Sequence, residues 1–294
     1  MHHLSRLALS ACVLAGLSKL CSPVLADTGL IARCDRLAGS PFDTHRAGPG
    51  VLASQADWPA AVIACRAAVT AHPDNARMHY LLGRALLGNE RRPELVKAAA
   101  LGYGAALASL GYDELNGTAA EAEKGLRDSK AALDAGEPAA AVALGNAFEF
   151  GIGVAADLTQ AERYYKIAAD AGIPDGLNDY AWMLTTRTGR HKEAEVLARR
   201  ALAIEPRHDS CNDTLAVILL HENQPDKALP FSVTAVSLAP DDASALDHYG
   251  DVLARLGRRT EALDQWRRAL ASTNISPNDI TFNRASIEEK LATK

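Results

Sequence analysis

The sequence predicts an all-α protein, a solenoid in which helical hairpins stack side by side. From residue 176 onward, apolar residues recur at helical spacing in paired segments that short polar turns join. Small residues and prolines return every 34 residues, at Ala194, Ala228 and Ala262, at Ala201, Ala235 and Ala269, and at Pro206 and Pro240. Small side chains let the two helices of a hairpin approach closely, and proline ends the second helix before the next unit begins.

Length and charge narrow the class of protein further. The chain has 294 residues, 48% of them apolar, and a formal charge of −5. A single core stops growing at about this length, so either two domains or a repeating architecture is expected. The acidic balance and the lack of basic patches with interleaved aromatic residues argue against nucleic acid as a partner.

The first 26 residues have the pattern of a secretory signal peptide. A short positive start is followed by an apolar run over residues 7–17, and small residues precede Asp27. We expect cleavage after Ala26 and a mature protein in the bacterial periplasm or outside the cell. The apolar run is shorter than the roughly 20 residues that span a bilayer, so no integral membrane segment is expected after cleavage. An alternative interpretation takes residues 9–12 as a lipoprotein box.

The segment after the signal peptide contains one of three remaining cysteines. Residues 27–56 carry glycine and proline clusters and are expected to form an irregular lead-in. In an oxidising compartment, a disulfide between Cys34 and Cys65 would attach this lead-in to the solenoid, and Cys211 would stay unpaired. The alternative is that Cys34 and Cys65 are two buried thiols.

The most regular repeats lie near the C-terminal end. The segments EAEVLARRALAIEP, KALPFSVTAVSLAP and EALDQWRRALAST resemble the second helices of tetratricopeptide repeats. The third unit matches the consensus best, with Gly250, Trp266 and Ala269 at the expected small and large positions. We interpret residues 175–274 as three such repeats, and the resemblance implies antiparallel helix pairs that wind into a superhelix.

Residues 139–174 resemble a Sel1-like repeat, a close relative with a longer connecting loop. The segment AVALGNAFEFGIGVAADLTQAERYYKIAADAGIPDG places Gly151 and Gly153 where the chain reverses. Asp157 is expected to cap the next helix. No strand precedes the two glycines, so they are interpreted as a turn and not as a phosphate-binding loop.

The remaining segments fit the same architecture less regularly. Residues 57–138 are interpreted as degenerate hairpins of the two repeat types. Residues 275–294 are expected to provide a C-terminal capping helix with Ile287 and Leu291 on one side. Such a helix would cover the apolar end of the last repeat, which stacked arrays need for solubility.

Three aspartates define the candidate binding face. Alignment of the three regular repeats places Asp179, Asp213 and Asp247 at one equivalent position on the first helices, and the resemblance implies that this position faces the concave groove. The residues one turn later are Met183, Val217 and Asp251. One interpretation is an acidic ladder flanked by apolar contacts, suited to a basic or amphipathic peptide. The other is three solvated aspartates that keep the face soluble.

No residue pattern indicates chemistry. His208 and Cys211 are close in sequence but have no second ligand pair, so no metal is expected. No serine lies in a nucleophile elbow, and no cysteine has a recognisable protease setting. We expect no catalytic residues and no cofactor.

The leading hypothesis is therefore a protein-interaction scaffold of the bacterial periplasm that binds segments of other proteins on its concave face. The Sel1-like resemblance implies an alternative, because some secreted members bind or slowly hydrolyse β-lactam-type ligands. Those proteins carry a cysteine pair within each repeat, which residues 139–174 lack.

Overall fold

The computed structural model describes residues 23–273 and 282–292. Within these ranges the chain forms helices joined by turns and contains no strand, which confirms the predicted all-α solenoid. None of the described helices combines the length and the apolar character needed to span a bilayer. The predicted signal peptide lies outside the described residues as far as position 22. Two compact units, divided after Tyr103, are described separately.

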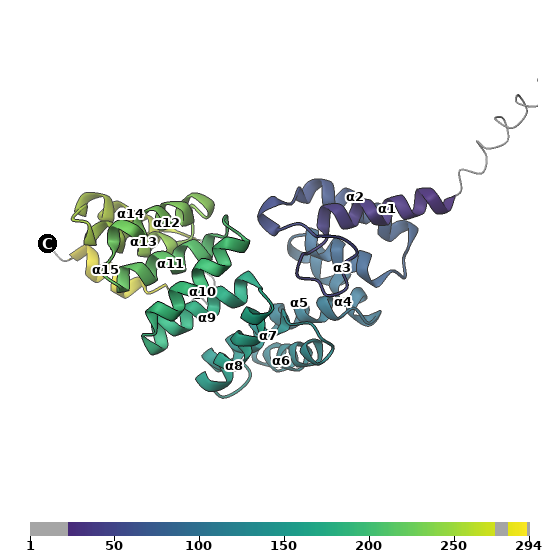
Figure 1. Ribbon diagram of the computed structural model, residues 1–294, viewed down its shortest axis with the longest axis horizontal. Coiled ribbons are helices and arrows are strands. Elements are labelled where there is room, and N and C mark those ends of the chain that lie inside the picture. Colours follow the sequence, from purple (N-terminus) through teal and green to yellow (C-terminus); the bar gives the residue numbers. More distant parts are fainter. Residues whose placement is uncertain (1–22, 274–281, 293–294) are drawn as a thin grey trace, which may run out of the picture. The chain divides into compact units, whose positions relative to one another are not determined.

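The first unit contains two helical hairpins (Figure 1). Its helices are α1 (Pro23–Ala38), α2 (Trp58–Ala71), α3 (Ala76–Ala85) and α4 (Arg91–Ala100), with short 3-10 turns η2 (Ala53–Gln55) and η3 (Gly88–Glu90). Helix α1 packs on α2, and α3 packs on α4. The lead-in expected over residues 27–56 is consequently irregular only after Ala38, because α1 is the first helix of a hairpin.

A disulfide joins the two helices of the first hairpin. Cys34 on α1 is bonded to Cys65 on α2, as predicted, and both side chains are fully buried. An ion pair between Asp35 and Arg77, 2.9 Å apart, connects α1 to α3 as well. The first helix is thus attached to α2 by a covalent bond and to α3 by an ion pair.

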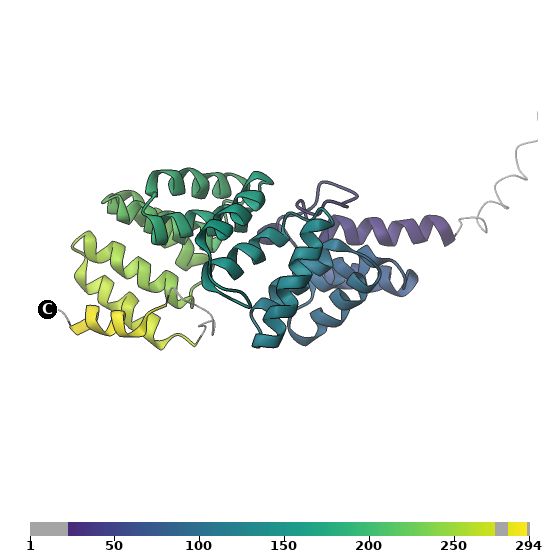
Figure 2. The ribbon, with the colours of Figure 1, turned by 90° about the horizontal axis from the view of Figure 1, so that it is seen from below.

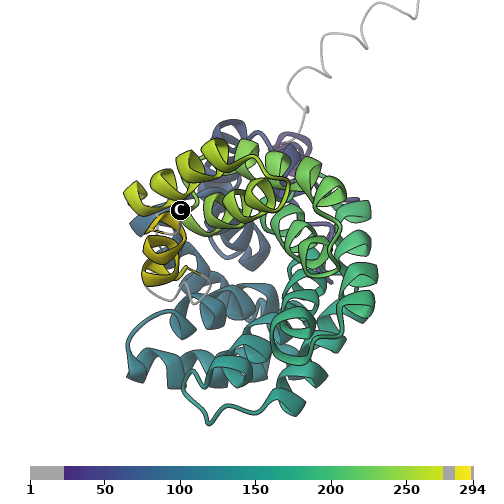
Figure 3. The ribbon, with the colours of Figure 1, turned by 90° about the vertical axis from the view of Figure 1, so that its left-hand side faces the viewer.

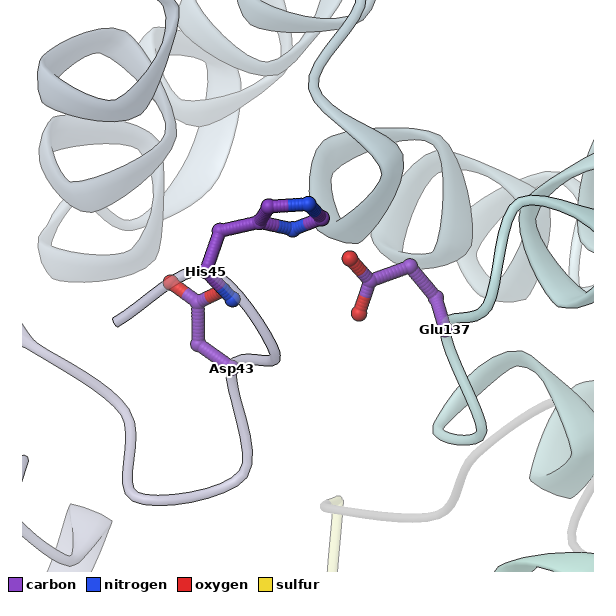
Figure 4. Close-up of side chains that lie close together, drawn as sticks. All are labelled: Asp43, His45 and Glu137. Atoms are coloured by element: carbon purple, nitrogen blue, oxygen red, sulfur yellow. The ribbon is translucent and has the colours of Figure 1, made fainter.

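The loop after α1 is ordered by polar side chains. Arg84 on α3 donates a hydrogen bond to the Ala38 carbonyl at 2.6 Å. Asp43 and His45 lie on this loop (Figure 4). The Asp43 carboxylate accepts hydrogen bonds from the backbone N–H of His45 at 2.9 Å and from the Tyr103 hydroxyl at 2.6 Å. Specific hydrogen bonds therefore hold a segment whose composition predicts no regular structure.

The second unit is a run of five hairpins followed by one further helix, as far as it is described. The hairpins are α5 (Gly104–Leu115) with α6 (Ala119–Asp134), α7 (Ala140–Phe150) with α8 (Leu158–Asp170), α9 (Pro174–Met183) with α10 (His191–Ile204), α11 (Asp209–His221) with α12 (Pro225–Leu238), and α13 (Ala243–Arg255) with α14 (Arg259–Ala271). A π-helical turn, η4 (Leu184–Thr188), extends α9. The hairpins follow one another along a curved path, from teal to yellow-green in Figure 3.

Side-chain caps begin these helices where the sequence offers them. Asp157 accepts hydrogen bonds from the backbone N–H groups of Thr159 and Gln160 at the start of α8, as expected from its position. Thr118 and Glu121 form a reciprocal capping box at the start of α6. Gly151 ends α7 with a φ of 70°, a conformation that glycine adopts without steric cost.

Small residues set the distance between paired helices. The repeated alanines are all fully buried: Ala194, Ala201, Ala228, Ala235, Ala262 and Ala269. Glycines of the first helices give room to aromatic rings of the second. A Cβ atom on Gly145 would overlap the Tyr165 ring, and one on Gly250 would overlap the Trp266 indole. The 34-residue spacing of these alanines in the sequence thus marks the positions at which paired helices pack closely.

Helix α15 (Arg284–Ala292) packs against the last hairpin, in yellow in Figure 2. Ile287 is fully buried in a cluster with Leu246, Leu253 and Trp266, and Leu291 packs against the same cluster. Ile287 and Leu291, which the sequence predicted to cover the end of the last repeat, therefore do pack against it.

Candidate functional site

The structure places the predicted aspartates on the first helices of three consecutive hairpins, but their surroundings differ. Asp179 lies on α9, Asp213 on α11 and Asp247 on α13. Asp213 and Asp247 are buried, so they are not solvated surface charges. Met183 and Val217, expected as apolar contacts for a partner, are also buried, at 1% and 6% exposure. In this conformation both support the core and are not available to a ligand.

At the third repeat, the chain supplies its own cation. Lys290 of α15 lies 2.8 Å from an Asp247 carboxylate oxygen and 2.7 Å from one of Asp251. Its ammonium group is 5.7 Å from the centre of the Trp266 ring. Burial lowers the pKa of Lys290, but the two carboxylates outweigh this effect and raise it. Asp247 and Asp251 are therefore part of the contact that attaches α15, which the repeat pattern alone does not reveal.

At the second repeat, the cation comes from the next hairpin. The Nδ1 atom of His248 on α13 lies 2.7 Å from a carboxylate oxygen of Asp213. Burial lowers the pKa of His248, whereas the charge of Asp213 and the hydrogen bond to it, with Asp247 and Asp251, raise it to about 9. At neutral pH this is therefore a charged pair, which links α11 to α13.

A cavity of about 320 Å³ lies next to Asp179 and Asp213, and we call it the Asp179 cavity. Its aromatic lining consists of Tyr112, Phe150, Tyr165 and Trp182. Its carboxylates are Glu149, Asp179, Asp209, Asp213 and Asp242. The exposed residues Tyr112 and Ser210 belong to the lining, so the cavity reaches the surface. Of the six predicted binding residues, the structure brings only Asp179 and Asp213 to this cavity.

Most of these carboxylates already have a structural role. Glu149 lies 3.1 Å from Nε of Arg187, which η4 carries, and accepts a hydrogen bond from Tyr165 at 2.8 Å. Asp242 caps α13 by accepting from the backbone N–H of Ala245. Asp213 pairs with His248, as described above, and Asp209 lies 3.6 Å from Nδ1 of His208.

Asp179 differs because its hydrogen bonds come from neutral amides. Asn178 donates to its carboxylate at 3.1 Å, and Asn146 is a second partner. Among the described residues, no lysine, arginine or histidine forms an ion pair with it. Burial is the main cause that raises the pKa of Asp179 to about 7, with contributions from Asp175 and Glu149. A carboxylate in this setting attracts a cation, which the described part of the chain does not provide.

Two buried oxygen atoms beside Asp179 also lack hydrogen-bond donors. They are Oδ1 of Asn178 and Oδ1 of Asp213, residues that are 8% and 9% exposed. A buried acceptor without a donor costs about 1–3 kcal/mol, so such atoms are uncommon unless a ligand or water satisfies them. Both residues line the Asp179 cavity.

Asp179→Asn is expected to stabilise the second unit at pH 8 by about 1–2 kcal/mol. Because the pKa of Asp179 is raised in the folded state, the folded protein loses stability as this group ionises between about pH 4 and pH 7. The amide keeps the shape and carries no charge, so the variant escapes that loss. Urea unfolding at pH 5 and pH 8 measures the difference, and an equal gain at both pH values would contradict the assignment.

Cys211, His208 and Asp175 have the residue types of a nucleophilic triad but not the accessibility. His208 Nε2 lies 3.0 Å from an Asp175 carboxylate oxygen, and its Nδ1 accepts a hydrogen bond from the Cys211 backbone N–H. The Cys211 thiol is fully buried, and burial raises its pKa. A reactive cysteine must form a thiolate and be accessible to substrate, and Cys211 is not accessible. The contact between His208 and Cys211 therefore caps the start of α11.

Comparisons with known proteins show the fold. No protein-family profile matches the chain, and no curated protein matches it. A Sel1 repeat protein from Oxalobacter formigenes is 21% identical over 72% of this chain and 85% of that protein, with a TM-score of 0.45. A tetratricopeptide repeat protein from Parabacteroides merdae is 17% identical over 80% of this chain and 91% of that one, with a TM-score of 0.44.

The structural similarity, measured by TM-score, is greater to a chain of the Cut9–Hcn1 hetero-tetramer of the APC/C. Here the TM-score is 0.60, with 16% identity over 94% of this chain. The match spans 56% of the length of that chain. At this identity the comparison shows the fold alone, an α-solenoid of stacked helical hairpins.

Proposed function

We propose that this protein is an interaction scaffold that binds segments of partner proteins on the face formed by the first helices of its second unit. The observation that carries the proposal is the Asp179 cavity, to which α5, α7, α9, α11 and α13 all contribute. A site built from consecutive repeats suits an extended segment that runs along them. The proposal assigns no catalytic step to the chain.

Two further observations support this role and its location. A chain with this fold is part of the Cut9–Hcn1 hetero-tetramer, a protein assembly. The signal-peptide pattern of residues 1–26 and the Cys34–Cys65 disulfide both fit an oxidising compartment, which supports our proposal that the protein acts in the periplasm or outside the cell.

Selection from a display library of 12-residue peptides against the full chain tests the proposal. We expect peptides whose affinity falls at least tenfold in Trp182→Ala, which removes an aromatic wall of the cavity. Val196→Ala is the matched control, because Val196 is 59% exposed on α10 and does not line the cavity. Selected peptides that bind wild type and Trp182→Ala equally well would show that this face is not the binding surface.

A further inference from the structure

We propose that the Asp179 cavity receives one basic side chain, lysine or arginine, from the segment that the scaffold binds. The inference rests on the proposed function and specifies what this site recognises. It follows from the repeat positions, from the atoms that line the cavity and from a contact that the chain makes with itself.

The repeat positions show which cation is missing. Asp247 pairs with Lys290, and Asp213 pairs with His248. Counting back 34 residues from His248 leads to Thr214, which carries no charge and lines the Asp179 cavity. The repeat position that supplies His248 to Asp213 therefore supplies only the small neutral Thr214 to Asp179.

The lining atoms favour a cation with N–H donors. The Asp179 carboxylate is a hydrogen-bond acceptor, and so are the unpartnered Oδ1 atoms of Asn178 and Asp213, whose residues belong to the cavity lining. An ammonium offers three donors and a guanidinium five, and neither has an acceptor. The Trp182 indole, whose ring centre is 5.7 Å from that of His248, adds an aromatic wall of the kind that attracts cations.

The size of the cavity is sufficient for a long basic side chain. At about 320 Å³, it lies at the lower end of the range for small-ligand sites. A lysine or arginine can place its apolar stem against the exposed Tyr112 ring while its charged end lies near the Asp179 carboxylate.

Lys290 provides an example of this recognition within the same molecule. Its ammonium lies between the carboxylates of Asp247 and Asp251, close to the Trp266 ring. An aspartate at the equivalent repeat position and an indole thus already hold one lysine of this chain. The Asp179 cavity offers the same two groups, with Trp182 as the indole.

Four peptide sets that differ in one residue test the inference. Each set has 12-residue peptides with randomised flanks and with arginine, lysine, citrulline or norleucine at the centre, arrayed and probed with the full chain. We expect the arginine and lysine sets to bind at least tenfold more tightly than the citrulline and norleucine sets. Equal binding of all four sets would overturn the cation site and leave the scaffold intact, whereas binding of no set would overturn both.

Two variants link this preference to the cavity. Asp179→Asn removes the charge without changing the shape, and Thr214→His restores the cation that the repeat pattern lacks, so each is expected to reduce the preference at least tenfold. Asp264→Asn on α14, where the carboxylate is 61% exposed, is the matched control and keeps the preference. Circular dichroism confirms folding, and a preference that persists in folded Asp179→Asn would overturn the proposal.

Discussion

Replacing both Cys34 and Cys65 with alanine is expected to lower the free energy of unfolding of the first unit by about 3.5 kcal/mol. The disulfide joins residues separated by 31 positions, and its loss returns the corresponding conformational freedom to the unfolded chain. Alanine avoids leaving a polar group at two positions that are fully buried. Urea unfolding followed by hydrogen exchange of α1 and α2 measures the effect on this unit.

The second unit provides the internal control for this experiment. Its described residues contain no disulfide, so hydrogen exchange of α9 to α14 is expected to be unchanged. Reduction of the wild-type protein by dithiothreitol should reproduce the alanine variant, and the reductant should not affect the variant itself. Unchanged exchange of α1 in the double variant would mean that the contacts of α1 hold it without the covalent bond.

Asp213→Asn is expected to destabilise the second unit by about 2–3 kcal/mol at pH 7. The pKa of His248, which Asp213 helps raise to about 9, would return towards its usual value of about 6.5. A raised histidine pKa stabilises the folded state fully below about pH 6.5, and this stabilisation is lost as the pH rises through 9. The difference between wild type and variant should therefore shrink between pH 7 and pH 10.

A double-mutant cycle separates the pair from other effects of Asp213. His248→Gln removes the titrating group, so Asp213→Asn should cost much less in that background than in the wild type. Urea midpoints at pH 6.5, 8 and 9.5 give the pH dependence of all four proteins. If Asp213→Asn cost the same at every pH and in both backgrounds, the stabilisation would not come from the Asp213–His248 charge pair.

The architecture could be predicted from the sequence because its packing rule is local and repeated. Buried alanines at Ala194, Ala228 and Ala262 recur with the period of the hairpins, and a period needs no knowledge of distant contacts. The disulfide could also be predicted, since the expected oxidising compartment and the three cysteines after residue 26 left few choices. Helix α1 was missed because the glycine and proline clusters that follow it dominate the composition of residues 27–56.

The candidate site could be predicted only in part. Repeat alignment identifies Asp179, Asp213 and Asp247 as equivalent, but it does not show which of them has a cationic neighbour. Lys290 reaches Asp247 from 43 residues away, through the packing of α15, and no period relates the two. Tyr112 on α5 and Trp182 on α9 do not occupy equivalent positions of the repeats. That both line one cavity could therefore be seen only in the three-dimensional structure.

The cavity draws its lining from consecutive hairpins, and this has a mechanical consequence. A solenoid behaves as a spring, because each hairpin contacts mainly its neighbours and small rotations add up along the array. A ligand that contacts α7, α9, α11 and α13 at once would connect four consecutive hairpins. It would therefore resist rotation of these hairpins relative to one another. A bound partner would then make the second unit stiffer. The force needed to stretch this unit should therefore be higher when a partner is bound.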